Sequence, residues 1–321
     1  MTYRILRRPR TLPVALMLAG LMLVSLMLAG ATQARVLEVG PNSPYTQPRM
    51  AGEHAQPGDV IRIAPGTYQD CMVVTADRVT IEGAGPTTVL ANTACRGKGI
   101  LVISGRDVTV RTLVLRGARV ADRNGAGIRA EGGNLTIESV QFIDNENGIL
   151  TAANQATSVR IRDSVFQSNG KCEPVCAHGI YAGQIALLRI ERSRFRETRV
   201  GHHIKSRASR TEIIDSEIID GPDGTASYLI DIPNGGDLLV ERTRLSKGPR
   251  AENPTGAIMI GMEGASTPSL FLRIIGNDFV NEMNRPTVFV VNRSRTPAIL
   301  EGNRISGPAR PLEGPGSVKE R

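Results

Sequence analysis

Residues suited to acid–base chemistry gather in the middle of the sequence. Three of the four histidines fall within positions 178–203, and tyrosine, lysine, arginine and aspartate lie nearby. The candidates for catalysis are Tyr181, His203, Lys205 and Arg207. The candidates for substrate binding are Arg129, His178, His202 and Asp231. This mixture of cations, imidazoles and a phenol suits an acidic sugar.

A lyase that acts on a uronate must neutralise a carboxylate, remove the C5 proton and protonate a leaving oxygen. An epimerase needs similar groups but returns the proton from the opposite face. We expect Lys205 or His203 as the base, Arg207 as the group that neutralises the carboxylate, and Tyr181 as the acid. Arg207 would also lower the pKa of Lys205 towards the range that a base needs.

Each candidate also has a structural interpretation. The histidines at 178 and 202 can be corner residues bonded to backbone, and the Lys–Arg pair can be solvated surface charges. Tyr181 can cover the adjoining loop, and Asp231 can cap a turn. Because polar residues of several types fall on adjacent repeats, the sequence still favours a site here.

Segments with one pattern recur along the chain. Leu135–Phe142, Val159–Phe166 and Leu188–Phe195 share apolar residues at alternate positions, then Ser or Thr, and looser copies give spacings of 23 to 34 residues. The alternation indicates strands with one inward face, and the Gly, Asn or Asp after each copy marks a turn. Repeats of this length indicate a solenoid.

A second short strand precedes most copies, with an isoleucine at its centre. The isoleucines that we expect to stack inside are Ile128, Ile149, Ile180, Ile204 and Ile230. The residues that follow them would form an outward row of Arg129, Leu150, Tyr181, Lys205 and Asp231. Since neighbouring strands lie about 4.8 Å apart, we expect one patch to be formed by Tyr181, His203, Lys205, Arg207 and Asp231. We predict an all-β, single-domain right-handed parallel β-helix of about ten rungs.

Three segments, Gly58–Tyr68, Val79–Gly83 and Asn145–Ile149, resemble the right-handed β-helix, pectin-lyase-like superfamily. The resemblance covers nearly the whole mature chain and implies the β-helix fold. It does not select an activity, because that superfamily includes lyases, hydrolases, epimerases and non-catalytic binding proteins.

Signatures of the known subfamilies are not intact. His203–Ser206 resembles the Lys-Ser step of chondroitinase-B-like and alginate lyases, but His202 and His203 replace the acidic calcium-binding residues that precede it there. The aspartate motifs of polygalacturonase-like hydrolases and the motifs of mannuronan epimerases and pectate lyases are absent. We therefore predict no metal site and no cofactor, with calcium left open because no ligand set is identified.

The first 34 residues have the pattern of a secretory signal. Four arginines precede an uncharged apolar run from Val14 to Gly30, and small residues follow, so we expect cleavage after Ala31 or Ala34. An uncleaved N-terminal anchor is the alternative. The net charge of the whole chain is +8, but without these arginines 35 Lys and Arg face 31 Asp and Glu, which gives +4. We expect a periplasmic or secreted protein that does not bind nucleic acid.

Four cysteines remain in the mature chain, and an even number in an exported protein indicates disulfides. We expect the pairs Cys71–Cys95 and Cys172–Cys176, because the members of each pair are close in sequence. The two other pairings stay open, and a zinc site is the weaker alternative because no histidine is placed as a partner.

These observations divide the chain into a signal peptide (1–34), a β-helix domain (35–307) and a flexible C-terminal tail (308–321). We predict a protein that acts on or binds an anionic, uronate-containing polysaccharide, as a lyase or a C5-epimerase. The alternative is a non-catalytic periplasmic module that binds polysaccharide or protein. We expect a monomer that contacts a membrane only through an uncleaved signal segment.

Overall fold

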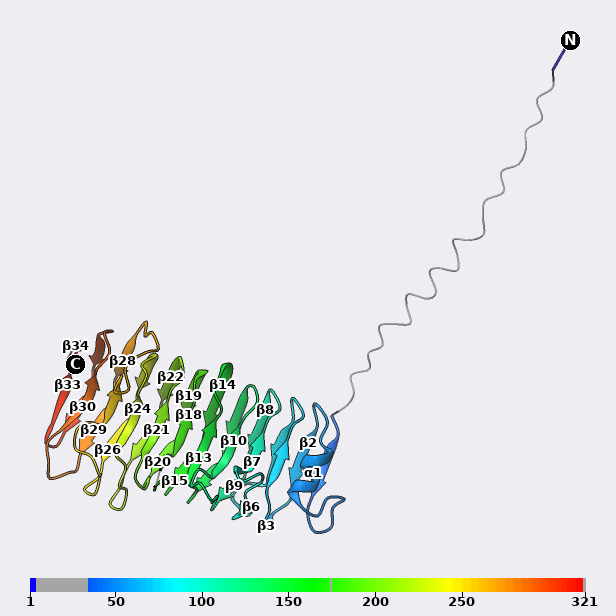
Figure 1. Ribbon diagram of the computed structural model, residues 1–321, viewed down its shortest axis with the longest axis horizontal. Coiled ribbons are helices and arrows are strands. Elements are labelled where there is room, and N and C mark those ends of the chain that lie inside the picture. The colour runs from blue at the N-terminus through cyan, green and yellow to red at the C-terminus, as the bar shows by residue number, and fades with distance from the viewer. Residues whose placement is uncertain (4–33, 174, 320–321) are drawn as a thin grey trace. The chain divides into compact units, whose positions relative to one another are not determined.

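The computed structural model describes residues 1–3, 34–173 and 175–319. The chain divides into two units, Met1–Ala34 and Arg35–Arg321, so the predicted signal segment lies almost entirely outside the described residues. In the second unit, the chain winds into a parallel β-solenoid of about 11 turns (Figure 1). The predicted all-β, parallel β-helix fold is confirmed.

Three long sheets, here called A, B and C, run along the solenoid, and a complete turn adds one strand to each. Sheet A consists of β1 (Val36–Val39), β2 (Val60–Ile63), β5 (Thr80–Glu82), β8 (Val108–Arg111), β11 (Leu135–Glu138), β14 (Asn154–Arg162), β19 (Ile185–Glu191), β22 (Arg210–Ile214), β25 (Asp237–Glu241), β28 (Leu272–Ile275), β31 (Ala298–Glu301) and β34 (Gly316–Lys319). Sheet B consists of β3 (Gly66–Tyr68), β6 (Thr88–Ala91), β9 (Val114–Arg116), β12 (Gln141–Ile143), β15 (Val165–Gln167), β20 (Arg194–Arg196), β23 (Glu217–Ile219), β26 (Arg244–Lys247), β29 (Asp278–Asn281) and β32 (Arg304–Ser306). Sheet C consists of β4 (Met72–Val74), β7 (Gly99–Ile103), β10 (Ala126–Ala130), β13 (Asn147–Thr151), β18 (Ile180–Ala182), β21 (His202–Ser206), β24 (Tyr228–Ile232), β27 (Ile258–Ile260), β30 (Thr287–Asn292) and β33 (Ala309–Glu313). A separate antiparallel hairpin joins β16 (Lys171–Cys172) to β17 (Cys176–Ala177).

The repeats align in register as the sequence predicts. In sheet B, Phe142 pairs with Phe166 and Phe166 with Phe195, and their rings stack with centroids 4.5 Å and 4.4 Å apart. In sheet C, Ile180 pairs with Ile204, and both are fully buried. Because identical or similar side chains meet on successive turns, the interior is a set of continuous apolar columns.

Sheet C differs from sheet A in the burial of its outward residues. Strand β11 in sheet A alternates between buried and half-buried residues, whereas β13 and β30 in sheet C are buried at every position. Outward charges in sheet A pair across strands, as Arg62 does with Glu38 and Glu82. The outward polar residues Lys205 and Asp231 of sheet C are also buried, and their withdrawal from water strengthens their interactions.

The N-terminal end carries two short helices that the strand pattern does not predict. Helix α1 (Pro48–His54) has proline at its start and buries Ala51 and Gly52, while η2 (Gly85–Thr87) is a single 3₁₀ turn. Gly52 has no room for a side chain, since a Cβ there would lie 2.5 Å from Cγ of Met72. Close packing of α1 on β4 thus helps to cap the first turn.

The C-terminal segment requires a correction. We expected residues 308–321 to form a flexible tail, but β33 pairs with β30 and β34 pairs with β31. The proline and glycine content misled the prediction, because the preceding strands present unpaired backbone groups that an extended segment can satisfy. The described part of this segment therefore extends the solenoid.

Both predicted disulfides are confirmed. Cys71 bonds to Cys95, and Cys172 bonds to Cys176. The second bond closes the β16–β17 hairpin, which projects between β15 and β18. No free cysteine is found among the described residues.

Candidate functional site

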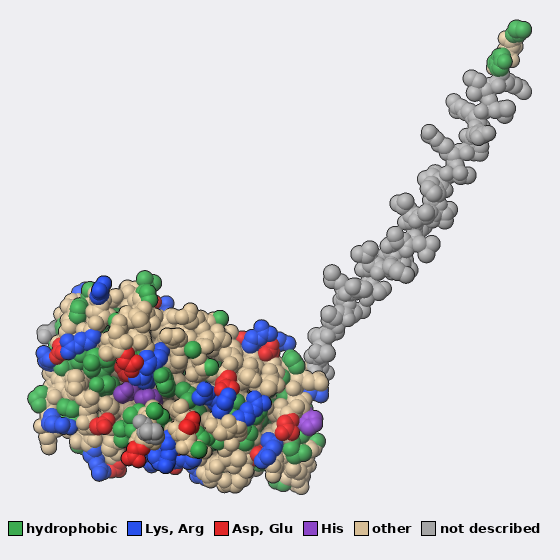
Figure 2. All heavy atoms as spheres, viewed as in Figure 1, with side chains coloured by type: hydrophobic (Ala, Val, Ile, Leu, Met, Phe, Trp, Pro, Cys, Tyr) green, Lys and Arg blue, Asp and Glu red, His purple; other side chains and the backbone are tan. Residues whose placement is uncertain are grey.

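The outward row that the sequence predicts is present on sheet C. Arg129 pairs with Leu150, Leu150 with Tyr181, Tyr181 with Lys205, and Lys205 with Asp231. Three neighbouring strands, β18, β21 and β24, thus place a phenol, an ammonium group and a carboxylate side by side. Figure 2 shows a group of histidine side chains left of the middle of the folded unit, with acidic and basic side chains near them.

Lys205 lies between two carboxylates. Its Nζ is 3.0 Å from Oδ2 of Asp231 and 2.8 Å from Oε1 of Glu263. Burial alone would lower the pKa of Lys205, but the two carboxylates outweigh burial and raise it. The expectation that Arg207 lowers this pKa is therefore wrong, because the carboxylates are closer partners. Lys205 is a protonated donor in this arrangement.

Arg207 follows β21 and connects Tyr181 to the same carboxylate. Its Nε donates to the Tyr181 hydroxyl at 3.0 Å, and its Nη2 is 2.7 Å from Oε2 of Glu263. Its Nη1 donates to Oδ1 of Asn234. Burial opposes the charge on Arg207, but Tyr181 and Glu263 outweigh burial and raise its pKa.

The pKa values of the carboxyl groups of Glu263 and Asp231 shift in opposite directions. Burial would raise the pKa of Glu263, but Lys205 and Arg207 outweigh burial and lower it. Burial raises the pKa of Asp231, which is 3 % exposed, and Lys205 offsets this only in part. Oδ1 of Asp231 has no hydrogen-bond partner among the described residues. We call Tyr181, Lys205, Arg207, Asp231, Asn234 and Glu263 the sheet C cluster.

Two histidines and a tyrosine stack beside this cluster. The rings of His178 and His202 are 4.8 Å apart, and those of His202 and Tyr228 are 4.9 Å apart. Nδ1 of His178 accepts from the His202 backbone N–H, and Nδ1 of His202 accepts from the Tyr228 backbone N–H. These donors assign the proton of each neutral ring to Nε2. In His202, Nε2 lies 3.4 Å from Oδ2 of Asp231.

The burial of these histidines predicts a stability that depends on pH. Burial lowers the pKa of His202 from 6.5 to about 3 and that of His178 well below its usual value. Between the lowered pKa values and 6.5, the unfolded chain therefore binds more protons than the folded chain. The free energy of unfolding should fall as the pH drops below 6.5. We expect each histidine to contribute a slope of about 1.4 kcal/mol per pH unit between its two pKa values. Urea unfolding measured from pH 7 to pH 4 tests this.

His202→Asn serves as the variant for that measurement, because an amide oxygen can still accept the Tyr228 N–H. The variant should have a smaller slope than the wild type over the same pH range. Equal slopes for the two proteins would contradict a neutral, buried His202.

His203 requires a correction. The sequence places it in the shared patch, but it points into the solenoid and is 0 % exposed. Its Nδ1 is 2.7 Å from Oγ1 of Thr198, and its Nε2 is 2.8 Å from Oδ1 of Asp220. It aligns with Gly179 in the preceding turn, a position next to the interior column. A surface ligand cannot reach it, so the base role proposed for it has no support.

Arg129 also lies apart from the cluster. Leu150 separates it from Tyr181 in the row, and its Nε lies 3.3 Å from Oε1 of Glu131. The structure thus brings together Tyr181, Lys205, Arg207 and Asp231 among the predicted residues, and it places His178 and His202 beside them.

Sequence reasoning missed Glu263, Asn234 and Tyr228. Glu263 lies in a loop from Gly261 to Ser269 that accounts for one of the longest repeat spacings, and an acidic residue in such a loop was a usable signal. Tyr228 aligns with His202 in the register of β21 and β24, so aligning the two repeats on their isoleucines would have identified it.

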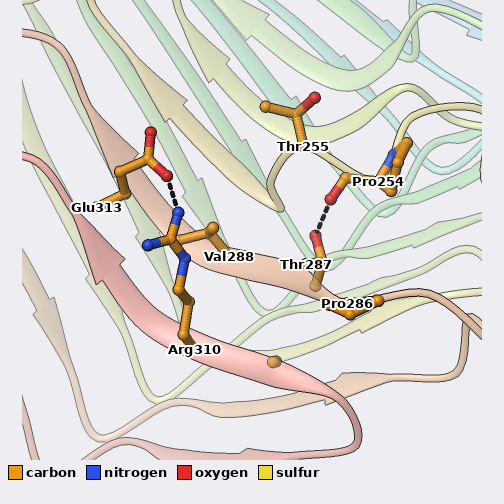
Figure 3. A pocket seen from close by; sticks show the side chains of 8 residues that line it. Pro254, Thr255, Pro286, Thr287, Val288, Arg310 and Glu313 are labelled. Carbon is orange, nitrogen blue, oxygen red and sulfur yellow. Dashed lines mark hydrogen bonds and ion pairs between the residues drawn. The ribbon is translucent and has the colours of Figure 1, made fainter.

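A separate pocket lies near the C-terminal end of the solenoid. It encloses about 550 Å³ between Pro254, Pro286 and Val288, with Arg310 paired to Glu313 at its side (Figure 3). A small apolar cluster of Met259, Val288 and Val291, on β27 and β30, packs against Tyr228 of β24. None of the residues of the sheet C cluster lines this pocket, so the two are distinct.

Two further observations concern the described residues alone. Across residues 1–3, 34–173 and 175–319, no three His, Cys, Asp or Glu side chains are grouped so that they could hold a metal ion. In the same ranges, no helix is long and apolar enough to cross a bilayer.

Comparison with an alginate lyase structure shows that the chain shares its fold. An alginate lyase from Paenibacillus sp. superposes with a TM-score of 0.59 at 17% identity, over 88% of this chain and 99% of that chain. The ORF18 protein of Geobacillus virus E2 has a TM-score of 0.48 at 13% identity, over 80% of this chain and 52% of that one. The A-module of a mannuronan C-5 epimerase from Azotobacter vinelandii has a TM-score of 0.41 at 15% identity, over 85% and 91% of the two chains.

No protein-family model matches the sequence, and no curated protein is significantly similar to it. The parallel β-helix fold is therefore shared with the alginate lyase structure, and the subfamily is not identified.

Proposed function

We propose that this protein binds a uronate-containing polysaccharide on the outer face of sheet C and acts on it there. One observation carries the proposal. Nζ of Lys205 and Nη2 of Arg207 reach different oxygens of a single carboxylate, that of Glu263, at 2.8 Å and 2.7 Å. Two cations that converge on one carboxylate form the arrangement needed to hold the carboxylate of a uronate. In the bound state the sugar carboxylate takes the place of Glu263.

The chemistry proposed at this position is β-elimination or C5 epimerisation. The carboxylate must be neutralised so that the neighbouring C5 proton becomes acidic, and Lys205 and Arg207 supply that charge. The Tyr181 hydroxyl, 3.0 Å from Nε of Arg207, is a group that can give or take a proton beside this position. Lys205 is held as a donor by Asp231, so we no longer assign it the role of base.

Export of the protein is part of the proposal. The N-terminal signal pattern supports it, and so do the two disulfides, which persist in oxidising compartments. The fold shared with a protein described as an alginate lyase makes a uronate polymer a reasonable first substrate to test.

The test is incubation with alginate, pectate and hyaluronan, with dextran as the neutral control. We expect binding to at least one uronate polymer and not to dextran. Elimination would appear as ultraviolet absorbance from an unsaturated uronate, and epimerisation as a change in the NMR signals of the C5 proton. Equal affinity for dextran and the uronate polymers, or no binding to any of them, would rule out the proposal.

A non-catalytic binding module is the second candidate, and the state of Lys205 favours it. The two carboxylates that hold its ammonium group leave no unpaired lysine base in the cluster. This candidate predicts saturable binding of a uronate polymer without any product, and binding that survives Tyr181→Phe.

The position of Glu263 predicts that its removal strengthens binding. Glu263→Gln keeps the size of the side chain but removes the charge that competes with the sugar carboxylate. We expect affinity for a uronate oligosaccharide to rise roughly tenfold, or about 1.4 kcal/mol. Isothermal titration calorimetry at low salt measures this. The matched control is Glu313→Gln, a carboxylate paired with Arg293 and Arg310 outside the cluster. Weaker binding by Glu263→Gln would contradict the proposal that the carboxylate of Glu263 occupies the position of the sugar carboxylate.

A further inference from the structure

The disulfide-closed hairpin β16–β17 walls a second pocket that the sheet C cluster does not include. The pocket encloses about 300 Å³ and is lined by Arg119, Glu146, Gly170, Lys171, Cys172, Glu173, Arg199 and Val200. Its walls come from the turns that lead into β10, β13, β18 and β21. Val200 precedes His202 by two residues, so the pocket adjoins the N-terminal ends of the strands that carry the cluster.

A buried carboxylate is the distinctive feature of this pocket. Glu146 is 1 % exposed, and its Oε2 accepts from the backbone N–H groups of Val120 at 3.1 Å and Gly125 at 2.8 Å. Gly125 permits this approach, because a Cβ there would lie 2.8 Å from Oε2. The other oxygen, Oε1, is buried and has no donor among the described residues. Burial of an oxygen without a donor destabilises the folded protein, and a ligand that donates to this oxygen would remove that cost.

The charges around Glu146 indicate what kind of donor fits. Asp144 accepts from Arg119 at 2.9 Å and from Arg199 at 2.7 Å. Lys171 makes no ion pair within the described part of the chain, and these three cations stand against the carboxylates of Asp144, Glu146 and Glu173. A metal ion or an amine would add positive charge beside the three cations, so a neutral hydroxyl is the donor that fits Oε1. The ammonium group of Lys171 offers a partner for an anionic group of the same ligand.

We propose that this pocket binds a single sugar acid, with a hydroxyl that donates to Oε1 of Glu146 and a carboxylate that faces Lys171 and Arg199. A volume of about 300 Å³ suits one sugar residue. The choice of a sugar acid rests on the proposed function, since the same polymer would then reach both sites. The pocket would hold a terminal or branching residue of that polymer and fix its position relative to sheet C.

The probes are D-glucuronate, D-glucose and acetate, titrated into the full chain and followed by NMR. D-glucuronate offers hydroxyls and charge together, whereas D-glucose offers only hydroxyls and acetate only charge. We expect D-glucuronate to bind at least tenfold more tightly than either of the others. An affinity for D-glucuronate no higher than that for acetate would overturn the proposal.

Two variants test the individual contacts. Glu146→Gln keeps an oxygen for the two backbone N–H groups but places an amide donor where Oε1 was, so D-glucuronate binding should fall at least tenfold. Lys171→Ala, on an exposed hairpin that should fold normally, should weaken D-glucuronate binding and leave D-glucose binding unchanged. Thermal melting of each variant checks that the fold is intact.

The NMR titration separates the pocket from the sheet C cluster, because the backbone signals of Gly125 and Gly170 report the pocket and those of Asn234 report the cluster. A response to D-glucuronate at Gly125 and Gly170 that is lost in Glu146→Gln supports the pocket, even if no uronate polymer is processed. A response confined to Asn234 places the sugar acid on sheet C and overturns the pocket proposal. An unchanged response at Gly125 and Gly170 in Glu146→Gln also overturns it.

Discussion

Arg207→Ala should reduce the affinity for a uronate oligosaccharide by about 10- to 100-fold. A hydrogen bond to a charged group contributes about 1.5–3 kcal/mol, and this substitution removes a guanidinium that now pairs with Glu263. It also removes the donor to the Tyr181 hydroxyl, so any turnover should fall by more than the affinity does. Titration calorimetry measures the binding, and product formation under saturating substrate measures the turnover.

The geometry of the site makes Arg207→Lys a sharper probe than the alanine variant. The guanidinium contacts Tyr181, Asn234 and Glu263 through three different nitrogens. A lysine ammonium keeps the charge but cannot span these three positions. We expect Arg207→Lys to recover less than half of the lost binding free energy. Full recovery would mean that only net charge matters and that the site does not orient the carboxylate.

Arg310→Ala is the matched control for both variants. Arg310 is an exposed arginine on the same sheet and is paired with Glu313 (Figure 3). Strands β27 and β30, which carry the apolar group around Met259, lie between its strand β33 and β24. Its removal should change affinity by less than twofold, because screened surface pairs contribute about 0–1 kcal/mol. A loss equal to that of Arg207→Ala would indicate non-specific attraction of a polyanion.

The fold was predictable from the sequence because each turn of a solenoid repeats the same pattern of apolar and polar residues. The columns of Ile180 and Phe166 recur at matching positions, so a register read from one repeat is checked by the next. The outward neighbours Tyr181, Lys205 and Asp231 follow from that register alone. The sequence alone therefore predicts that Tyr181, Lys205 and Asp231 of the sheet C cluster lie side by side, because they follow the stacked isoleucines of successive turns.

The errors concern side chains whose direction or state depends on neighbours from other turns. His203 occupies the position of Gly127, Gly148 and Gly179 in the preceding turns, and those glycines mark a place beside the interior column. That signal was present but was not used. The pKa of Lys205 is raised by Asp231 and by Glu263 against the effect of burial. Glu263 is 58 residues away in the chain, and no local pattern reports such a partner.

The second large effect that we expect concerns stability, at the centre of the aromatic column. Phe166→Ala should lower the free energy of unfolding by about 3–5 kcal/mol, which is the cost of removing a buried phenylalanine. Its ring is 1 % exposed and stacks on both Phe142 and Phe195, so a cavity would interrupt contacts with two turns at once. Urea unfolding followed by circular dichroism measures the loss.

Relaxation of the surroundings cannot easily fill that cavity. The backbone of the next sheet is already close, since a Cβ on Gly148 would lie 2.8 Å from Cδ1 of Phe166. Phe271→Ala is the control, because that ring is half-buried and packs beside arginine side chains. It should cost about 1 kcal/mol or less. Each turn of a solenoid contacts only its neighbours, so Phe166→Ala should also split the unfolding transition into two steps. A single transition with wild-type midpoint would show that the aromatic column does not couple the two halves.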